Sequence, residues 1–296
     1  MSSPRPVTRR VVVDSTLALV GVVVPMWVAT RATSPGSTTH TALSTSSAQA
    51  LPRATVDRAA LAARLDAHRD ARGGTMGLVV HDLRSGQRFA WRSFTNESLS
   101  TIKVLILVAC LRKCQEDAKD LTDEQHKRAR RMIQSSDNVA TDSLLAWVDT
   151  ANVQRAAVDL GLKGTEVKGG SAGGWWGYST TTPDDLVTLL DAIALGTAVI
   201  HAGHRAYIRH LMAGVVPAQR WGVADPPLPN GVYTETKNGW GPLPDGYRLN
   251  SIGRVVGDGR SHTMAILTRS PQGFRYGKET ISGLSKIVHE ALALPL

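Results

Sequence analysis

The sequence contains few cysteines and lacks the short motifs in which proteins usually hold a metal ion. Only Cys110 and Cys114 occur among 296 residues. Two cysteines four residues apart on one helix are poorly placed for an unstrained disulfide. No C-x-x-C or H-E-x-x-H segment occurs, and the nine histidines are scattered. The sequence therefore predicts a protein without a metal ion or any other cofactor.

Compositional bias and nucleic-acid motifs are also lacking. Apolar residues make up 42% of the chain, which is enough for a packed core and does not suggest disorder. The net charge of +9 is spread along the chain and is densest in H-K-R-A-R-R at residues 126–131, which reads as the solvated face of a helix. Without an accompanying recognition motif we predict no nucleic-acid partner. A basic exported protein can instead be attracted to anionic cell-wall polymers.

The first 50 residues resemble an export signal rather than part of a fold. Arg5, Arg9 and Arg10 precede an apolar stretch over residues 11–29, and a Ser/Thr-rich run follows. This order is typical of a signal peptide or signal anchor, and T-R-R-V-V-V resembles a twin-arginine signal. Asp14 interrupts the apolar stretch, and no A-x-A cleavage site lies directly behind it. We expect the protein to be exported. It would be either secreted or anchored to the outer face of the membrane through this segment alone, and whether the segment is cleaved stays open.

Residues 51–296 are predicted to form one domain. Helices are expected over 55–70, 99–114, 121–134, 138–148, 152–160, from 183, over 204–212 and over 278–292. Strands are expected over 75–81, 87–91, 232–237, 249–257 and 263–269. Strands at both ends with helices between them imply an α/β sandwich. It would consist of a five-stranded antiparallel sheet flanked by helices (sheet part about 55–98 and 225–296) with an inserted all-helical subdomain (about 99–224). An active site would lie in the seam between the two parts.

Ser100 and Lys103 are the first candidate catalytic pair, in the segment S-T-I-K. A spacing of three residues places both side chains on one face of a helix, one turn apart. Ser100 would lie at the helix start, where unpaired N–H groups favour developing negative charge. Lys103 would lie among apolar residues, where burial lowers the pKa of an amine and makes a neutral base accessible. The alternative is a helix-capping serine followed by a solvated lysine.

Two further segments complete a candidate constellation. S-D-N at residues 136–138 lies between two expected helices, where the Ser136 hydroxyl can relay a proton and the Asn138 amide can donate and accept. A turn with a helix cap would explain the same letters. K-N-G at residues 237–239 lies in a β-rich run, where Lys237 gives a positive charge and Gly239 lets a substrate approach the backbone.

S-x-x-K, S-D-N and K-[ST]-G, in this order, resemble the signature of class A β-lactamases and penicillin-binding proteins. The resemblance extends from about residue 55 to residue 296. It implies that Ser100 is acylated, that Lys103 is its base and that Ser136 protonates the leaving nitrogen. Asn138 would hold the substrate's side-chain amide, and Lys237 would bind its carboxylate. The oxyanion hole would consist of the backbone N–H groups of Ser100 and Trp240.

Three departures from the family pattern limit what can be transferred. Asn238 stands where the family has Thr or Ser, so an amide would replace a hydroxyl contact to the substrate carboxylate. Only 36 residues separate Ser100 from Ser136, which suggests a trimmed helical part. The family's E-x-x-L-N segment, which carries the deacylation carboxylate, is absent, and Glu166 is the remaining candidate base. Arg220 and Arg248 are candidate anchors for a substrate carboxylate.

These departures leave the substrate open. The leading interpretation is a serine hydrolase that opens β-lactam amides, as in β-lactam catabolism and antibiotic resistance. A D,D-carboxypeptidase or acyltransferase acting on short acyl-peptides is the first alternative, because hydrolysis of the ester needs a positioned base. The second is a non-catalytic cell-wall-binding module with the same fold.

Overall fold

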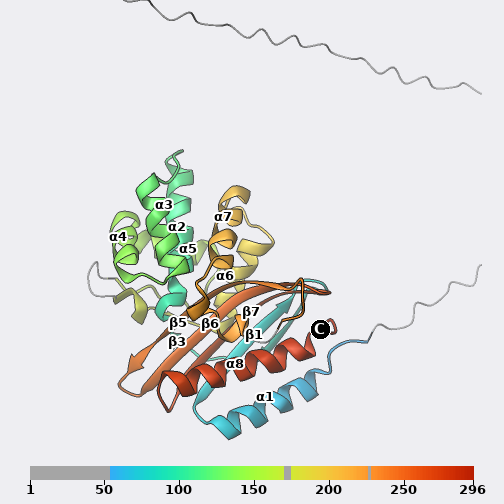
Figure 1. Ribbon diagram of the computed structural model, residues 1–296. Helices are drawn as coiled ribbons and strands as arrows, with labels where there is room; N and C mark the ends of the chain where they lie inside the picture. The colour runs from blue at the N-terminus through green and yellow to red at the C-terminus, as the bar shows by residue number, and fades with distance from the viewer. Residues whose placement is uncertain (1–53, 170–174, 226–227) are drawn as a thin grey trace, which may run out of the picture. The chain divides into compact units, whose positions relative to one another are not determined.

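A computed structural model describes residues 54–169, 175–225 and 228–296 (Figure 1). The predicted export signal lies outside these residues, so it stays a prediction. Within the three described ranges, no helix combines the length and the apolar character that a membrane span requires.

Helices and strands follow the order expected from the sequence, with boundaries moved by a few residues. Four short 3₁₀ turns also occur in the described chain: η1 (Leu99–Thr101), η2 (Trp175–Tyr178), η3 (Pro217–Gln219) and η4 (Gly222–Ala224). The strands are β1 (Thr75–Asp82), β2 (Gln87–Trp91), β3 (Asn96–Glu97), β4 (Thr180–Thr181), β5 (Tyr233–Leu243), β6 (Gly246–Gly257) and β7 (Arg260–Ser270). The helices are α1 (Arg58–Arg72), α2 (Ile102–Glu116), α3 (Asp123–Gln134), α4 (Asn138–Val148), α5 (Thr150–Asp159), α6 (Pro183–Ala194), α7 (Ala202–Ala213) and α8 (Phe274–Ala291).

One antiparallel sheet joins the two ends of the domain. Its strand order is β2-β1-β7-β6-β5, and every neighbouring pair is antiparallel. The central pairing connects β1 to β7, with Val79 opposite Ala265. The helices α2 to α7 are therefore inserted between β2 and the C-terminal strands, as Figure 1 shows. The predicted five-stranded α/β sandwich is confirmed.

Each face of the sheet packs against a separate apolar core, because successive side chains along a strand point to opposite faces of the sheet. On β7, Met264 and Ile266 pack in the core covered by α1 and α8, whereas Ala265 and Leu267 face the core shared with the helical insertion. Helix α2 lies in this second core with a continuous buried run from Ile102 to Leu111, as its apolar composition predicted.

Polar residues cap the N-termini of α3 and α6. Thr122 and Gln125 form a reciprocal capping box at the start of α3. Thr182 caps α6, and Pro183 occupies its first turn, where the missing N–H has no helical partner to lose. These caps fix where α3 and α6 begin.

Two features near Ser100 differ from the sequence expectation. The chain forms the 3₁₀ turn η1 over Leu99–Thr101 before α2 begins at Ile102, so Ser100 precedes the α-helix. In addition, β3 and β4 form a separate two-stranded sheet in which Asn96 pairs with Thr181. A two-residue strand has no periodicity that a sequence pattern could reveal.

A buried amide pair fixes the segment that leads into Ser100. The Asn96 amide donates to Asn250 Oδ1 at 3.0 Å, and Asn250 Nδ2 donates to the carbonyl of Glu97 at 2.7 Å and that of Ser98 at 3.2 Å. Both asparagines are fully buried. Strand β6 therefore holds the backbone two residues before the candidate nucleophile.

We expect Asn250→Ala to lower the free energy of unfolding by about 1–3 kcal/mol, because the buried amide and carbonyl partners lose their hydrogen bonds. Urea unfolding followed by circular dichroism measures this loss, with the exposed Asn230→Ala as the control. Equal stability of the two variants would contradict the role given to Asn250.

Candidate active site

A cleft with a volume of about 330 Å³ lies where η1, η2, the start of α4 and β5 meet. It contains the candidate nucleophile and sits in the seam between sheet and helical insertion, where the sequence analysis expected it. The residues that line it are Leu99, Ser100, Asn138, Trp176, Gly177, Tyr178, Trp240, Gly241, Pro242 and Leu243.

Gly239 allows the edge strand β5 to approach the backbone of Ser100. A Cβ atom at this position would lie 2.7 Å from Ser100 N, 2.9 Å from Ser98 O and 3.0 Å from Thr101 N. These are backbone atoms that cannot rotate away, so a larger residue would force β5 and η1 apart. The glycine is required for the close approach of the two segments.

Two non-glycine residues next to the site adopt positive φ angles. Leu99, directly before Ser100, has φ 48°, and Ser136 has φ 57°. Left-handed backbone costs a residue with a side chain about 1–3 kcal/mol, and such strain persists only where surrounding contacts hold it. At Ser136 this conformation lets the carbonyl and the hydroxyl of one residue both reach the same amine.

That amine belongs to Lys103, which is fully buried. Its Nζ donates to Ser136 O at 2.7 Å, to Asn138 Oδ1 at 2.8 Å and to Ser136 Oγ at 3.2 Å. An ammonium has three N–H groups, so these three acceptors saturate it. Among the described residues no hydrogen bond joins Lys103 to Ser100, which lies one turn away.

Burial lowers the pKa of Lys103 from 10.5 to about 7, and the negative charges of Asp137 and Asp142 oppose this shift. No carboxylate accepts a hydrogen bond from Lys103 within the part of the chain that the structure describes. The amine is thus poised to lose its proton near neutral pH, when its lone pair becomes able to accept the Ser100 proton.

Lys237 approaches the same hydroxyl from β5. Its Nζ donates to Ser136 Oγ at 2.9 Å and to Asn238 O at 2.8 Å, and its side chain is fully buried. Burial, followed by the nearby charge of Lys103, holds the pKa of Lys237 well below its usual range. Two buried amines that share one hydroxyl disfavour simultaneous protonation, so Ser136 can pass a proton between them.

The orientation of the Asn138 amide follows from Lys103. Because a protonated lysine can only donate, the amide oxygen faces Lys103, which leaves the NH₂ group for the cleft that Asn138 lines. Asp137 has a structural role, since its carboxylate caps α4 by accepting from Ala140 N and pairs with Arg131. The backbone hydrogen bond from Ala140 is the main reason that the pKa of Asp137 is lowered.

The prediction that the Asn238 amide contacts a substrate carboxylate is corrected by its position. Its side chain is buried, and its Nδ2 donates to the carbonyls of Gln219 at 2.8 Å and Trp221 at 3.0 Å. The amide therefore fastens the η3–η4 segment to β5 instead of facing a substrate carboxylate. Gln219 in turn donates to Ser135 O at 2.9 Å, so this segment also supports the turn that carries Ser136.

Trp240 lines the cleft, and its indole ring packs on Trp221 and Phe274. This aromatic packing anchors β5 at the residue whose backbone N–H was predicted for the oxyanion hole. The alternation of β5 explains the arrangement, since Lys237, Gly239 and Gly241 lie on the face toward Ser136 and η1.

The two arginines proposed as carboxylate anchors are engaged elsewhere. Arg248 is almost fully buried, donating to Glu97 at 2.7 Å and to both Asp245 oxygens at 2.7 and 2.9 Å. Arg220 donates to Ala213 O and Thr234 Oγ1. Their observed partners give both guanidinium groups structural roles.

Glu166, considered as the deacylation base, also lies outside the cleft. It forms an antiparallel bridge with Thr180, and its largely exposed carboxylate pairs with Lys168. It does not line the cleft, and neither does any other Asp or Glu of the described residues. These contacts are those of a surface residue in a short β-bridge.

Trp176 and Asp142 contribute to the site without a signal that the sequence analysis could use. The Trp176 ring lies 4.6 Å from Lys103 Nζ, and its Nε1 donates to Asp142 Oδ1 at 2.7 Å. A contact between Trp176 and Lys103 depends on how η2 packs against α2 and α4, which no local sequence pattern shows.

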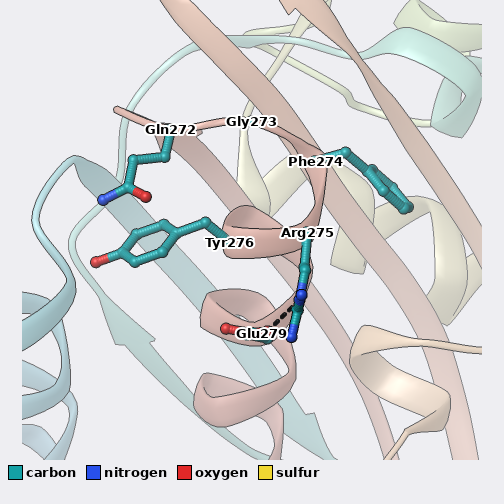
Figure 2. A pocket seen from close by; sticks show the side chains of 6 residues that line it. All are labelled: Gln272, Gly273, Phe274, Arg275, Tyr276 and Glu279. Carbon is teal, nitrogen blue, oxygen red and sulfur yellow. Dashed lines mark hydrogen bonds and ion pairs between the residues drawn. The ribbon is translucent and has the colours of Figure 1, made fainter.

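A second hollow, at the start of α8, carries no comparable chemistry (Figure 2). Its lining comes from one short segment, residues 272–279. Figure 2 shows Phe274 and Tyr276 turned away from each other, and Arg275 paired with Glu279 at 3.3 Å. Without converging polar groups this surface is not a candidate site.

Comparison with known proteins agrees with the geometry of the fold. A family model described as "Beta-lactamase enzyme family" matches residues 59–130 and 126–292. No curated protein sequence matches the chain. Three solved structures illustrate the structural similarity.

A β-lactamase from Sphaerobacter thermophilus DSM 20745 has 19% identity and a TM-score of 0.68, covering 81% of this chain and 100% of its own. A class A β-lactamase representative from Bacteroides cellulosilyticus DSM 14838 has 17% identity and a TM-score of 0.69, covering 81% and 99%. The class A β-lactamase from Mycobacterium abscessus has 20% identity and a TM-score of 0.66, covering 78% and 98%. At these identities the likeness establishes the fold.

Two substitutions at Ser136 distinguish the cost of its backbone strain from the role of its hydroxyl. Ser136→Gly should be about 1 kcal/mol more stable than Ser136→Ala, because only glycine adopts the left-handed conformation without a Cβ penalty. Both variants lose the hydroxyl between the two amines. Labelling of Ser100 by a fluorophosphonate should therefore slow in both. Chemical denaturation and labelling rates measure the two effects, and a more stable alanine variant would contradict the strain.

Proposed function

The chain belongs to the β-lactamase enzyme family, and from that premise we propose that it is a serine hydrolase that cleaves β-lactam amides through an ester on Ser100. The observation that carries the proposal is the buried Lys103–Ser136–Lys237 chain beside Ser100, with no carboxylate hydrogen-bonded to either amine among the described residues. Buried cationic groups without counter-ions are costly, so a merely structural role would not explain them.

Ester formation requires that one proton moves before the amide bond breaks. Neutral Lys103 accepts the Ser100 hydroxyl proton as Oγ attacks the carbonyl carbon, and the carbonyl oxygen becomes an oxyanion. When the tetrahedral intermediate collapses, the carbon–nitrogen bond breaks. Ser136 donates its proton to the leaving nitrogen and recovers one from a protonated amine.

The oxyanion would be bound by the backbone N–H groups of Ser100 and Trp240. The close approach of β5 at Gly239 supports this assignment, because it brings the strand carrying Trp240 against the backbone of Ser100. Fixed N–H groups stabilise developing charge without reorganising during the reaction.

Asn138 and Lys237 provide the polar contacts expected for substrate binding. The Asn138 NH₂ group is left for an acceptor in the cleft, such as the carbonyl of an acylamino side chain. We assign the substrate carboxylate to Lys237, because the guanidinium groups of Arg220 and Arg248 have other partners.

A D,D-carboxypeptidase or acyltransferase acting on short acyl-peptides is the second candidate. It is favoured by one observation: no described carboxylate lines the cleft to activate a hydrolytic water.

Export through residues 1–50, and with it access to cell-wall polymers, forms part of either proposal. It is supported by the twin arginines and the apolar run that follows them.

Replacement of the nucleophile tests the proposal directly. Wild-type protein incubated with benzylpenicillin should gain one penicilloyl mass in an intact mass spectrum, and Ser100→Ala should gain none. Ser93→Ala, at an exposed serine, serves as the control and should be labelled normally. A non-catalytic module would show no adduct in any variant, and labelling of Ser100→Ala would assign the wrong serine.

The pH dependence of acylation tests the base. Because the neutral form of Lys103 is reactive and its pKa is lowered to about 7, the acylation rate should rise through a midpoint near pH 7 and level off above it. Lys103→Arg keeps a positive charge but remains protonated, so acylation should fall by about 10²–10⁴-fold. Stopped-flow mixing with a chromogenic cephalosporin measures both effects. Wild-type rates in the arginine variant would make Lys103 structural.

A further inference from the structure

The indole ring of Trp176 packs against the Lys103 amine. The three N–H groups of the ammonium point to Ser136 O, Ser136 Oγ and Asn138 Oδ1. The indole ring lies 4.6 Å from Nζ and is itself only 3% exposed. An ammonium over an aromatic face is attracted electrostatically, and the ring also excludes water from that side.

Asp142 fixes the position of this ring. The Trp176 Nε1–H donates to Asp142 Oδ1 at 2.7 Å, and Asp142 lies on α4, one turn after Asn138. A charge-assisted hydrogen bond of this length restricts the indole to one orientation. The same carboxylate raises the pKa of Lys103, against the stronger lowering by burial.

The backbone on the C-terminal side of Trp176 is held against the segment before Ser100. Ser98 N donates to Ser179 O at 2.7 Å, and β3 pairs with β4 immediately beyond. A Cβ at Gly177 would lie 3.8 Å from Leu99 Cα, so η2 and η1 are in direct contact. Trp176 is therefore part of a packed wall of the cleft.

A water that attacks the Ser100 ester needs a base within hydrogen-bond reach. Lys103 is the candidate base beside Ser100, but the buried indole ring of Trp176 packs against its amine and closes that side to water. The described lining of the cleft offers no carboxylate as a substitute. An ester on Ser100 would thus lack an activated water.

We propose that Trp176, oriented by Asp142, is a positioning residue that shields Lys103 from water and so prolongs the life of the Ser100 acyl-ester. This inference rests on the proposed formation of that ester. In hydrolysis, water oxygen bonds to the ester carbonyl carbon, the bond to Ser100 Oγ breaks, and the water's proton returns to Ser100 through the base. The shield slows this step and leaves time for another acyl acceptor.

The inference is tested by the lifetime of the ester. Each protein is mixed with benzylpenicillin, free penicillin is removed, and the acylated fraction is followed by intact mass spectrometry. The wild-type ester should persist, whereas Trp176→Ala should lose it at least about tenfold faster, because water gains access to Lys103. Trp176→Phe keeps a ring over Lys103 and should lie close to wild type.

The neighbouring Trp175→Ala is the matched control. Trp175 is 59% exposed, and its ring contacts Tyr178 in a tilted arrangement instead of Lys103, so its loss should leave the lifetime unchanged. Trp176→Leu, which retains more buried apolar volume, replaces the alanine variant if that protein fails to fold. An unchanged lifetime in the folded Trp176 variant would overturn the inference.

Asp142→Asn separates a specific role from a general loss of structure. The asparagine oxygen can still accept from Trp176 Nε1, so the ester lifetime should stay long. Removal of the charge should move the midpoint of the acylation pH profile to lower pH, because Asp142 raises the pKa of Lys103. The other charged groups that act on this site, Asp137 on α4 and Lys237 on β5, are unchanged. An unshifted midpoint would contradict the coupling.

Different outcomes would refute the acyl-enzyme and the Trp176 shield. If no adduct forms on wild-type protein, the proposed acyl-enzyme is wrong. If the adduct forms and decays at the same rate in the wild type and in the Trp176 variants, the acyl-enzyme stands and the shield is wrong. Rapid hydrolysis by the wild type would also overturn the shield.

Discussion

The site depends on the burial of two lysine amines around a single serine hydroxyl. Lys103 and Lys237 are fully buried and both donate to Ser136 Oγ, at 3.2 and 2.9 Å. Desolvation without a hydrogen-bonded carboxylate disfavours their charged forms, which makes a neutral amine available near neutral pH. The surrounding structure serves this arrangement: the left-handed backbone at Ser136 directs two acceptors to Lys103, and Gly239 lets β5 bring Lys237 within reach.

The topology explains how such a costly cluster can be maintained. Ser100 and Lys103 enter from the insertion, Ser136 from the turn before α4, and Lys237 from the edge strand of the sheet. Each segment is fastened independently, by Asn250 behind Ser98, by Gln219 at Ser135 and by aromatic packing around Trp240. The free energy from two apolar cores offsets the strain at Leu99 and Ser136 and the desolvation of the two amines.

The sequence predicted those parts of the structure that depend on local patterns. Strand alternation and apolar periodicity indicated the five-stranded sheet and the inserted helices. The resemblance of three short segments to a known signature indicated that Lys103, Ser136 and Lys237 meet near Ser100, and the structure brings them together beside the cleft. The sequence could not predict features that arise when distant segments meet. The amide of Asn238 binds loop carbonyls, the guanidinium of Arg248 is held by Glu97 and Asp245, and Trp176 reaches Lys103 only through tertiary packing.

The central claim is that Lys103 is largely neutral slightly above neutral pH in the folded protein. It is tested most directly by a ¹³C NMR titration of the lysine side chains, with the Lys103 signal assigned by its absence from Lys103→Arg. The account predicts a midpoint of about 7 for Lys103. A midpoint close to the ordinary value of 10.5 would mean that the amine stays charged, and the proposed base would be contradicted.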